Sequence, residues 1–200
     1  MGAMRKPVRT RRREVVASPT LARWGGAAAC LAGVSYGALG YLDDPDTPEI
    51  FFGTVVPVLR LTTPALFLGG LVGLYSRLGG GGSPLLARAG LLVGLLGTVQ
   101  GVVSGVDRWA PPPYLVSHHW LPLLFAGLTI VGVATLLSED APRLLGALVL
   151  ASVTLGWVSV LTDAAFPGVL VAMRPVHVAF AALFCMGAIV WGGALFRGAS

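Results

Sequence analysis

The sequence of 200 residues has few charged residues and very few cysteines. Only 12% of its residues are Asp, Glu, Lys or Arg, and two are Cys. Soluble domains carry about 25% charged residues, so this composition excludes an ordinary soluble globule. Cys30 and Cys185 form no CxxC pair and both lie in apolar stretches. They are therefore interpreted as small packing residues, not as redox groups or metal ligands.

The sequence also lacks the motifs of covalent and cofactor chemistry. It has no nucleophile elbow, no P-loop, no Rossmann glycine fingerprint, and neither HExxH nor HxxxH spacing. These absences favour a noncatalytic protein with no resident metal or cofactor.

What the chain does contain is long apolar segments: 55% of its residues are hydrophobic, and the mean hydropathy is +0.80. A transmembrane helix needs about 20 apolar residues to cross a hydrocarbon core about 30 Å thick. The sequence predicts an all-α polytopic integral membrane protein, a bundle of six transmembrane helices spanning residues 24–197. The six segments are Trp24–Leu42, Phe52–Ser76, Pro84–Val106, His119–Leu137, Arg143–Thr162 and Pro175–Phe196.

Helix starts are indicated by capping residues and prolines. Ser83 before Pro84 suits an N-cap followed by a first-turn proline, and Asp140 can cap the fifth segment. Pro175 is expected in the first turn of the sixth.

Residues 1–23 form a basic tail that contains seven of the fourteen Lys and Arg residues. Self-repulsion predicts that this tail is disordered. A basic stretch before an apolar run also resembles a signal peptide, but the first segment is longer than a typical signal core, so an uncleaved first helix is expected. Membrane topology accounts for the positive charge of this tail, so no nucleic-acid partner is predicted from it.

The distribution of Lys and Arg also predicts the orientation. With the N-terminus inside, the inner flanks hold eleven Lys and Arg and the outer flanks hold two, Arg108 and Arg174. Basic flanks stay on the cytoplasmic side during insertion. The sequence therefore predicts a multi-pass protein of the plasma membrane with both termini in the cytoplasm.

Glycines recur at helical spacing in the first three segments. In the third segment they lie every three or four residues, which places them on one face that a neighbouring backbone can approach closely. Pairs four residues apart repeat the pattern in the first and second segments. These faces predict close packing, either within one chain or with a second copy or another membrane subunit. The glycines are Gly33, Gly37, Gly69, Gly73, Gly90, Gly94, Gly97, Gly101 and Gly105.

Polar residues inside or beside the apolar segments gather toward the outer side of the predicted membrane. Such residues are costly in a bilayer and often mark a functional site. We expect them to form a polar, outward-opening cleft that contains Arg60, Gln100, Asp107, Asp163, Arg174 and His177. Arg60 is the first candidate, with Asp107 or Asp163 as its partner; in the alternative interpretation it extends to the outer interface and only sets the depth of its helix.

The histidines suggest a second hypothesis. His119 at the head of the fourth segment and His177 in the sixth are expected at similar depth, where two imidazoles could ligate one haem b. A water-boundary position beside Trp120 explains the same histidines without a cofactor.

The leading functional hypothesis is a small-solute permeation or binding component, or a subunit of a membrane complex. The alternative is a haem- or quinone-linked electron-transfer subunit.

Overall fold

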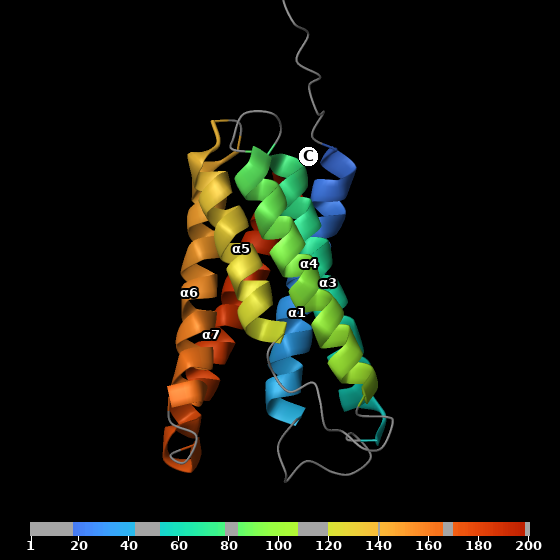
Figure 1. The fold of residues 1–200 in the computed structure, drawn as a ribbon, viewed down its shortest axis with the longest axis vertical. Helices are drawn as coiled ribbons and strands as arrows, with labels where there is room; N and C mark the ends of the chain where they lie inside the picture. Colours follow the sequence, from blue (N-terminus) through green and yellow to red (C-terminus); the bar gives the residue numbers. More distant parts are fainter. Residues whose placement is uncertain are drawn as a thin grey trace, which may run out of the picture.

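The computed structural model describes residues 18–42, 53–78, 84–107, 120–139, 141–165 and 170–198. These residues form α-helices that run side by side (Figure 1). The helices of the described residues are α1 (Pro19–Leu42), α3 (Val55–Arg77), α4 (Pro84–Asp107), α5 (Trp120–Leu137), α6 (Arg143–Ala165) and α7 (Leu170–Arg197).

Five of these helices, α3 to α7, are long and apolar enough to cross a membrane. The remaining helix, α1, has 24 residues but does not reach the same hydropathy. Eleven of its 24 residues are Gly or Ala, which carry little or no hydrocarbon. The structure therefore supports a membrane-embedded helical protein, with five candidate spans in the part of the chain described.

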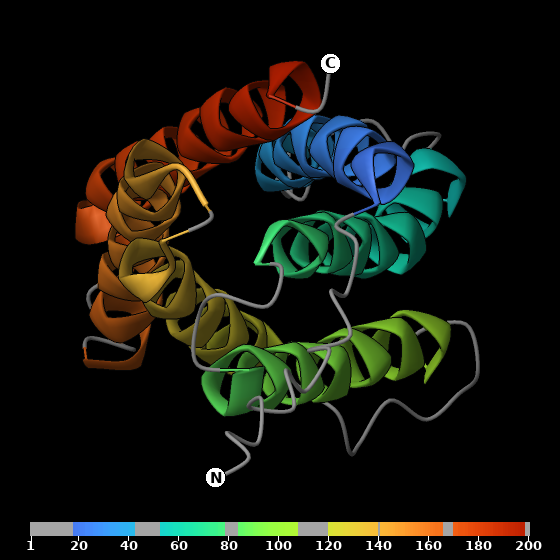
Figure 2. The same ribbon diagram turned by 90° about the horizontal axis from the view of Figure 1, so that it is seen from above.

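The helices follow one another around a ring in the order α1, α3, α4, α5, α6, α7 (Figure 2). Each helix packs mainly against the next one in this order, and α7 packs against α1 to complete the ring. Consecutive helices run in opposite directions, so α1 starts and α7 ends at the same end of the bundle (Figure 1). We call this arrangement the helix ring.

Small residues allow α1 to lie close to both of its neighbours. A Cβ atom added at Gly25 would meet the backbone of Gly73 in α3, and one added at Gly26 would lie 2.6 Å from the carbonyl oxygen of Gly192 in α7. At such distances a side chain larger than hydrogen cannot be accommodated without a shift. The composition that lowers the hydropathy of α1 thus also lets it fit between α3 and α7.

The glycine face of the third segment packs inside the chain. A Cβ at Gly97 would lie 2.5 Å from the backbone nitrogen of Leu124 in α5, and one at Gly101 would lie 2.8 Å from the ring of Pro64 in α3. Gly69 and Gly33 likewise face α1 and α7 of the same chain. These faces are occupied by intrachain contacts, so a partner subunit would need another surface; assembly with a second copy stays a prediction.

Helix edges differ from the sequence expectation most at two places, the starts of α1 and α7. α1 begins at Pro19, five residues before Trp24, and the hydroxyl of Ser18 accepts a bond from the Leu21 amide at 3.4 Å. α7 begins at Leu170, so the expectation that Pro175 occupies its first turn is wrong. In both cases the helix continues past the apolar segment that marked it, because a helix does not have to end where its hydropathy falls.

Pro84 is the first residue of α4, as expected. The caps predicted at Ser83 and Asp140 lie outside the described residues, as does the tail before Ser18.

Five of the six arginine side chains that the structure describes lie at the end of the ring where α1 begins and α3 ends, which we call the arginine end. These are Arg23, Arg77, Arg88, Arg143 and Arg197. The sixth, Arg60, lies toward the opposite end.

Candidate functional site

The residues of the predicted polar cleft fall on helices at the end opposite the arginine end. Asp107 is the last residue of α4, Asp163 lies in the last turn of α6, and Arg174 and His177 lie in the first part of α7. The side chains of these four residues lie outside what the structure describes, so the cleft itself stays a prediction. Arg60 and Gln100 can be followed in detail.

Arg60 is partly buried and lies early in α3. The helix begins at Val55, two residues before Pro57, which places Arg60 about 7.5 Å from its start at 1.5 Å per residue. Around the helix it lies within about 60° of Thr63 and Phe67, at about 100° per residue. Because Phe67 points into the helix ring, Arg60 belongs to the inward half of α3.

The last turn of α4 lies beside Arg60. A Cβ atom at Gly105 would be 3.4 Å from the backbone carbonyl oxygen of Arg60. Asp107 follows two residues later, about 200° around α4 from Gly105, and its side chain lies outside what the structure describes, so its pairing with Arg60 stays a prediction. Gln100 lies about 140° around α4 from Gly105, at about 100° per residue, so α4 does not direct it toward Arg60.

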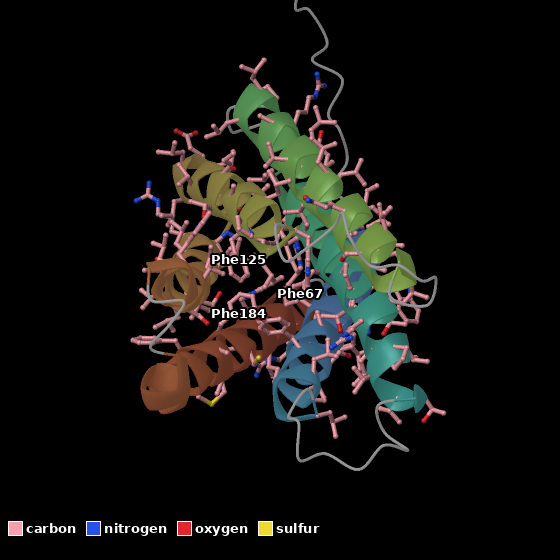
Figure 3. All side chains as sticks on the ribbon, turned by 60° about the horizontal axis from the view of Figure 1, so that its bottom comes forward. Phe67, Phe125 and Phe184 are labelled. Carbon is pink, nitrogen blue, oxygen red and sulfur yellow. The ribbon has the colours of Figure 1, made fainter. Side chains whose placement is uncertain are left out.

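Five aromatic residues meet inside the helix ring, one from each of five helices. We call them the aromatic cluster. The ring centroids of Phe125 and Phe184 are 4.8 Å apart, and Phe67 stacks on Phe184 at 5.6 Å. Figure 3 shows these three phenylalanines pointing toward one another from α3, α5 and α7. Tyr36 packs edge-on against Phe67 and Phe184, and Trp157 packs against Phe125 at 6.0 Å.

The aromatic cluster fills the middle of the ring. Phe67, Phe125 and Phe184 are at most 1% exposed. Sequence reasoning did not single them out, because isolated aromatics in apolar segments look like ordinary packing residues. The available signal was an aromatic residue near the middle of several segments.

Two buried polar atoms lie on opposite sides of the aromatic cluster. The Thr63 hydroxyl oxygen lies one turn from Phe67 toward the Arg60 end, and the indole nitrogen of Trp191 lies two turns from Phe184 toward the arginine end. Both residues are fully buried, and neither atom has a hydrogen-bond partner in the described part of the chain.

Trp191 projects into the ring from α7. The tip of its indole lies 2.9 Å from where a Cβ of Gly70 in α3 would stand, although α1 lies between α3 and α7. Thr63 shares the inward stripe of α3 with Phe67 and Gly70, at spacings of four and seven residues. Both atoms therefore belong to residues on the inward faces of their helices.

Other buried hydroxyls are bonded within their own helices. Thr98 donates to the carbonyl oxygen of Gly94 at 2.9 Å, Thr135 to that of Val131 at 2.8 Å, and Ser152 to that of Val149 at 2.9 Å. An unmade hydrogen bond of a buried polar group costs about 1–3 kcal/mol. Thr63 thus differs from these three residues, whose hydroxyls each donate a hydrogen bond to their own helix.

The described residues contain no group of three or more His, Cys, Asp or Glu that could hold a metal ion. His119 lies outside the described residues, as does the side chain of His177. The haem hypothesis therefore stays a prediction.

No protein-family model, no curated protein and no solved structure matches this chain. Function is therefore inferred from the residues and their geometry.

Proposed function

We propose that this chain is a plasma-membrane protein in which α1 crosses the bilayer together with the five more apolar helices. Support comes from the position of α1, which packs along α3 and α7 and has a length of about 36 Å at 1.5 Å per residue. The arginine end lies in the cytoplasm, because basic residues at helix ends are retained there during insertion.

Within that membrane domain, the protein acts as a permeation or binding component for a small polar or anionic solute. The observation that carries this proposal is the pair of buried, unpartnered polar groups, Thr63 and Trp191, on the two sides of the aromatic cluster. A bundle that needed only to pack would gain nothing from such groups, whereas a solute path through the ring needs hydrogen-bonding groups along it.

In this proposal the aromatic cluster closes the path. Hydrophobic constrictions stop permeation by excluding water, and three phenylalanines in contact leave no room for water between them. Arg60, on the inward half of α3 near the outer end, supplies the positive charge that draws an anionic or polar solute toward Thr63. Passage then requires the cluster to separate.

Truncation of the cluster tests the proposal. Phe184→Ala is expected to raise the flux of chloride and glycerol through proteoliposomes at least tenfold, because it removes the ring that contacts Phe67, Phe125 and Tyr36. Chloride is followed with an entrapped fluorescent indicator and glycerol by stopped-flow light scattering. Phe67→Ala is made in parallel, so that a folding failure in one variant leaves the other.

Leu183→Ala is the matched control, since Leu183 precedes Phe184 and is 41% exposed on the outer face of α7. In the Phe184→Ala background, Arg60→Glu is expected to lower chloride flux relative to glycerol flux. If folded Phe184→Ala and Phe67→Ala proteins conduct no more than Leu183→Ala, the chain has no solute path at its centre.

A further inference from the structure

Three arginines from three helices lie at or beside the C-terminal end of α7. The guanidinium of Arg23 in α1 lies 5.3 Å from the centre of the Phe196 ring in α7. Arg197 follows Phe196, and the next residue, Gly198, lies against Arg77 of α3: a Cβ added there would be 3.5 Å from the Nη2 atom of Arg77. Arg23, Arg77 and Arg197 form what we call the arginine cluster.

Arg77 has a hydrogen-bond donor without an acceptor. Its Nη2 atom is buried and has no hydrogen-bond partner in the described residues. A guanidinium carries five N–H donors in a planar fork that matches the geometry of phosphate and carboxylate oxygens. A buried donor on a charged group is costly to leave unbonded, so this position favours an acceptor that is absent from the protein residues described.

The described side chains offer no acid for this role. Glu139 is the only acidic residue among them, and it lies between α5 and α6, away from the three helices that carry the cluster. The carbonyl ends of α3 and α7 contribute partial negative charge near Arg77, which explains why a cation is tolerated there. They do not provide Nη2 with a hydrogen bond.

The arginine cluster lies at the ends of candidate membrane spans. The candidate spans of α3 and α7 end at Arg77 and Arg197 themselves. Trp24, which follows Arg23, is 72% exposed, as expected for a tryptophan at a membrane boundary. With these helices spanning the bilayer, as proposed above, the three guanidiniums lie near the phosphates of one leaflet.

We propose that the arginine cluster binds the phosphate of an anionic glycerophospholipid from that leaflet. Basic sites between transmembrane helices on the cytoplasmic side bind such headgroups. Arg77 donates from its Nη2 atom, and Arg23, whose guanidinium lies over the Phe196 ring, supplies a second positive charge at the same end of α7. The acyl chains of the lipid then lie along the apolar outer surface of α1 and α7, where Leu31 and Val190 are exposed.

Lipid binding is measured on the purified full-length protein. Phosphatidylglycerol added to detergent micelles is expected to raise the thermal unfolding midpoint, and native mass spectrometry should retain one copy per chain; phosphatidylcholine should do neither. Arg77→Gln should weaken phosphatidylglycerol binding about ten- to a hundredfold, the effect of losing one charge-assisted hydrogen bond. Arg77→Lys, which keeps the charge and loses the planar fork, should show an intermediate loss.

Arg88→Gln and Arg143→Gln are matched controls, because both arginines are exposed at the same end of the ring but belong to α4 and α6. They should bind phosphatidylglycerol as the unaltered protein does. An equal loss of phosphatidylglycerol binding in Arg77→Gln and Arg88→Gln would show that the lipid is held by nonspecific electrostatic attraction and not at a defined site. Equal stabilisation by phosphatidylcholine would exclude recognition of the anionic headgroup. Equal protection by soluble glycerol 3-phosphate would identify a free anion as the ligand and overturn the lipid proposal.

Discussion

At the scale of single residues, polar side chains in this protein mostly bond to their own helix. The hydroxyl of Thr129 donates to the carbonyl oxygen of Phe125 at 2.7 Å, and its oxygen accepts a bond from the indole nitrogen of Trp157 at 3.3 Å. This second bond joins α5 to α6. It also fixes the orientation of Trp157 against Phe125, at the edge of the aromatic cluster.

We expect this interhelical bond to contribute measurably to stability. Bonds of this kind in membrane proteins average about 0.6 kcal/mol and reach about 1.7 kcal/mol. A double-mutant cycle with Trp157→Phe and Thr129→Val, followed by unfolding in mixed detergent micelles, should give a coupling energy in this range. The cycle removes the packing change that each substitution causes alone. A coupling energy of zero would mean that the two groups do not bond.

At the scale of helices, contact depends on glycine more than on the hydropathy of a segment. Hydrocarbon side chains gain little by leaving lipid for another helix, so association relies on close van der Waals packing. α4 and α5 illustrate this: a Cβ at Gly127 would lie 2.5 Å from both the Cα and the backbone nitrogen of Gly94. No side-chain rotation can relieve this contact, because the atoms that a Cβ would meet belong to the backbone of Gly94.

Two glycine substitutions should therefore differ in their effect on stability. Gly127→Ala forces α4 and α5 apart and is expected to lower the free energy of unfolding by about 1–3 kcal/mol, the usual cost of overpacking. Gly193→Ala meets nothing nearer than 4.0 Å and should leave stability unchanged or raise it by up to about 1 kcal/mol through helix propensity. Detergent-induced unfolding followed by circular dichroism measures both, and equal effects would contradict the packing argument.

At the scale of the whole molecule, the direction of α1 determines whether the two ends of the chain share one side of the membrane. Five candidate spans alone would place the chain ends on opposite sides, whereas a sixth crossing by α1 returns them to the same side. The exposed arginines at one end of the ring favour the second arrangement.

Cysteine labelling of intact cells tests this topology. In a Cys30→Ala, Cys185→Ala background, Ala3→Cys and Glu139→Cys should be protected from a membrane-impermeant maleimide, whereas Asp46→Cys should react. Protection of both Ala3→Cys and Asp46→Cys would show that α1 does not cross. Labelling of Glu139→Cys together with protection of Asp46→Cys would show that the protein has the opposite orientation in the membrane.

Much of the helix content could be predicted from the sequence, but the interior could not. Pro84 and Leu137 were placed correctly as helix ends because hydropathy falls or a proline begins a turn there. Arg60 was recognised because a charge in an apolar segment is conspicuous. Thr63 was not, since a single threonine in a transmembrane helix usually bonds to its own backbone.

The sequence by itself determined that this protein belongs in a membrane, which residues form its long helices and where its arginines gather, because hydropathy, turn residues and charge act locally along the chain. Only the tertiary structure decided that the helices close into a ring, that five aromatics from five helices meet inside it, and that Arg23 of α1 and Arg77 of α3 both lie against the end of α7. Those features depend on which helix faces touch, and a contact between residues far apart in the chain leaves no periodic trace in either segment alone.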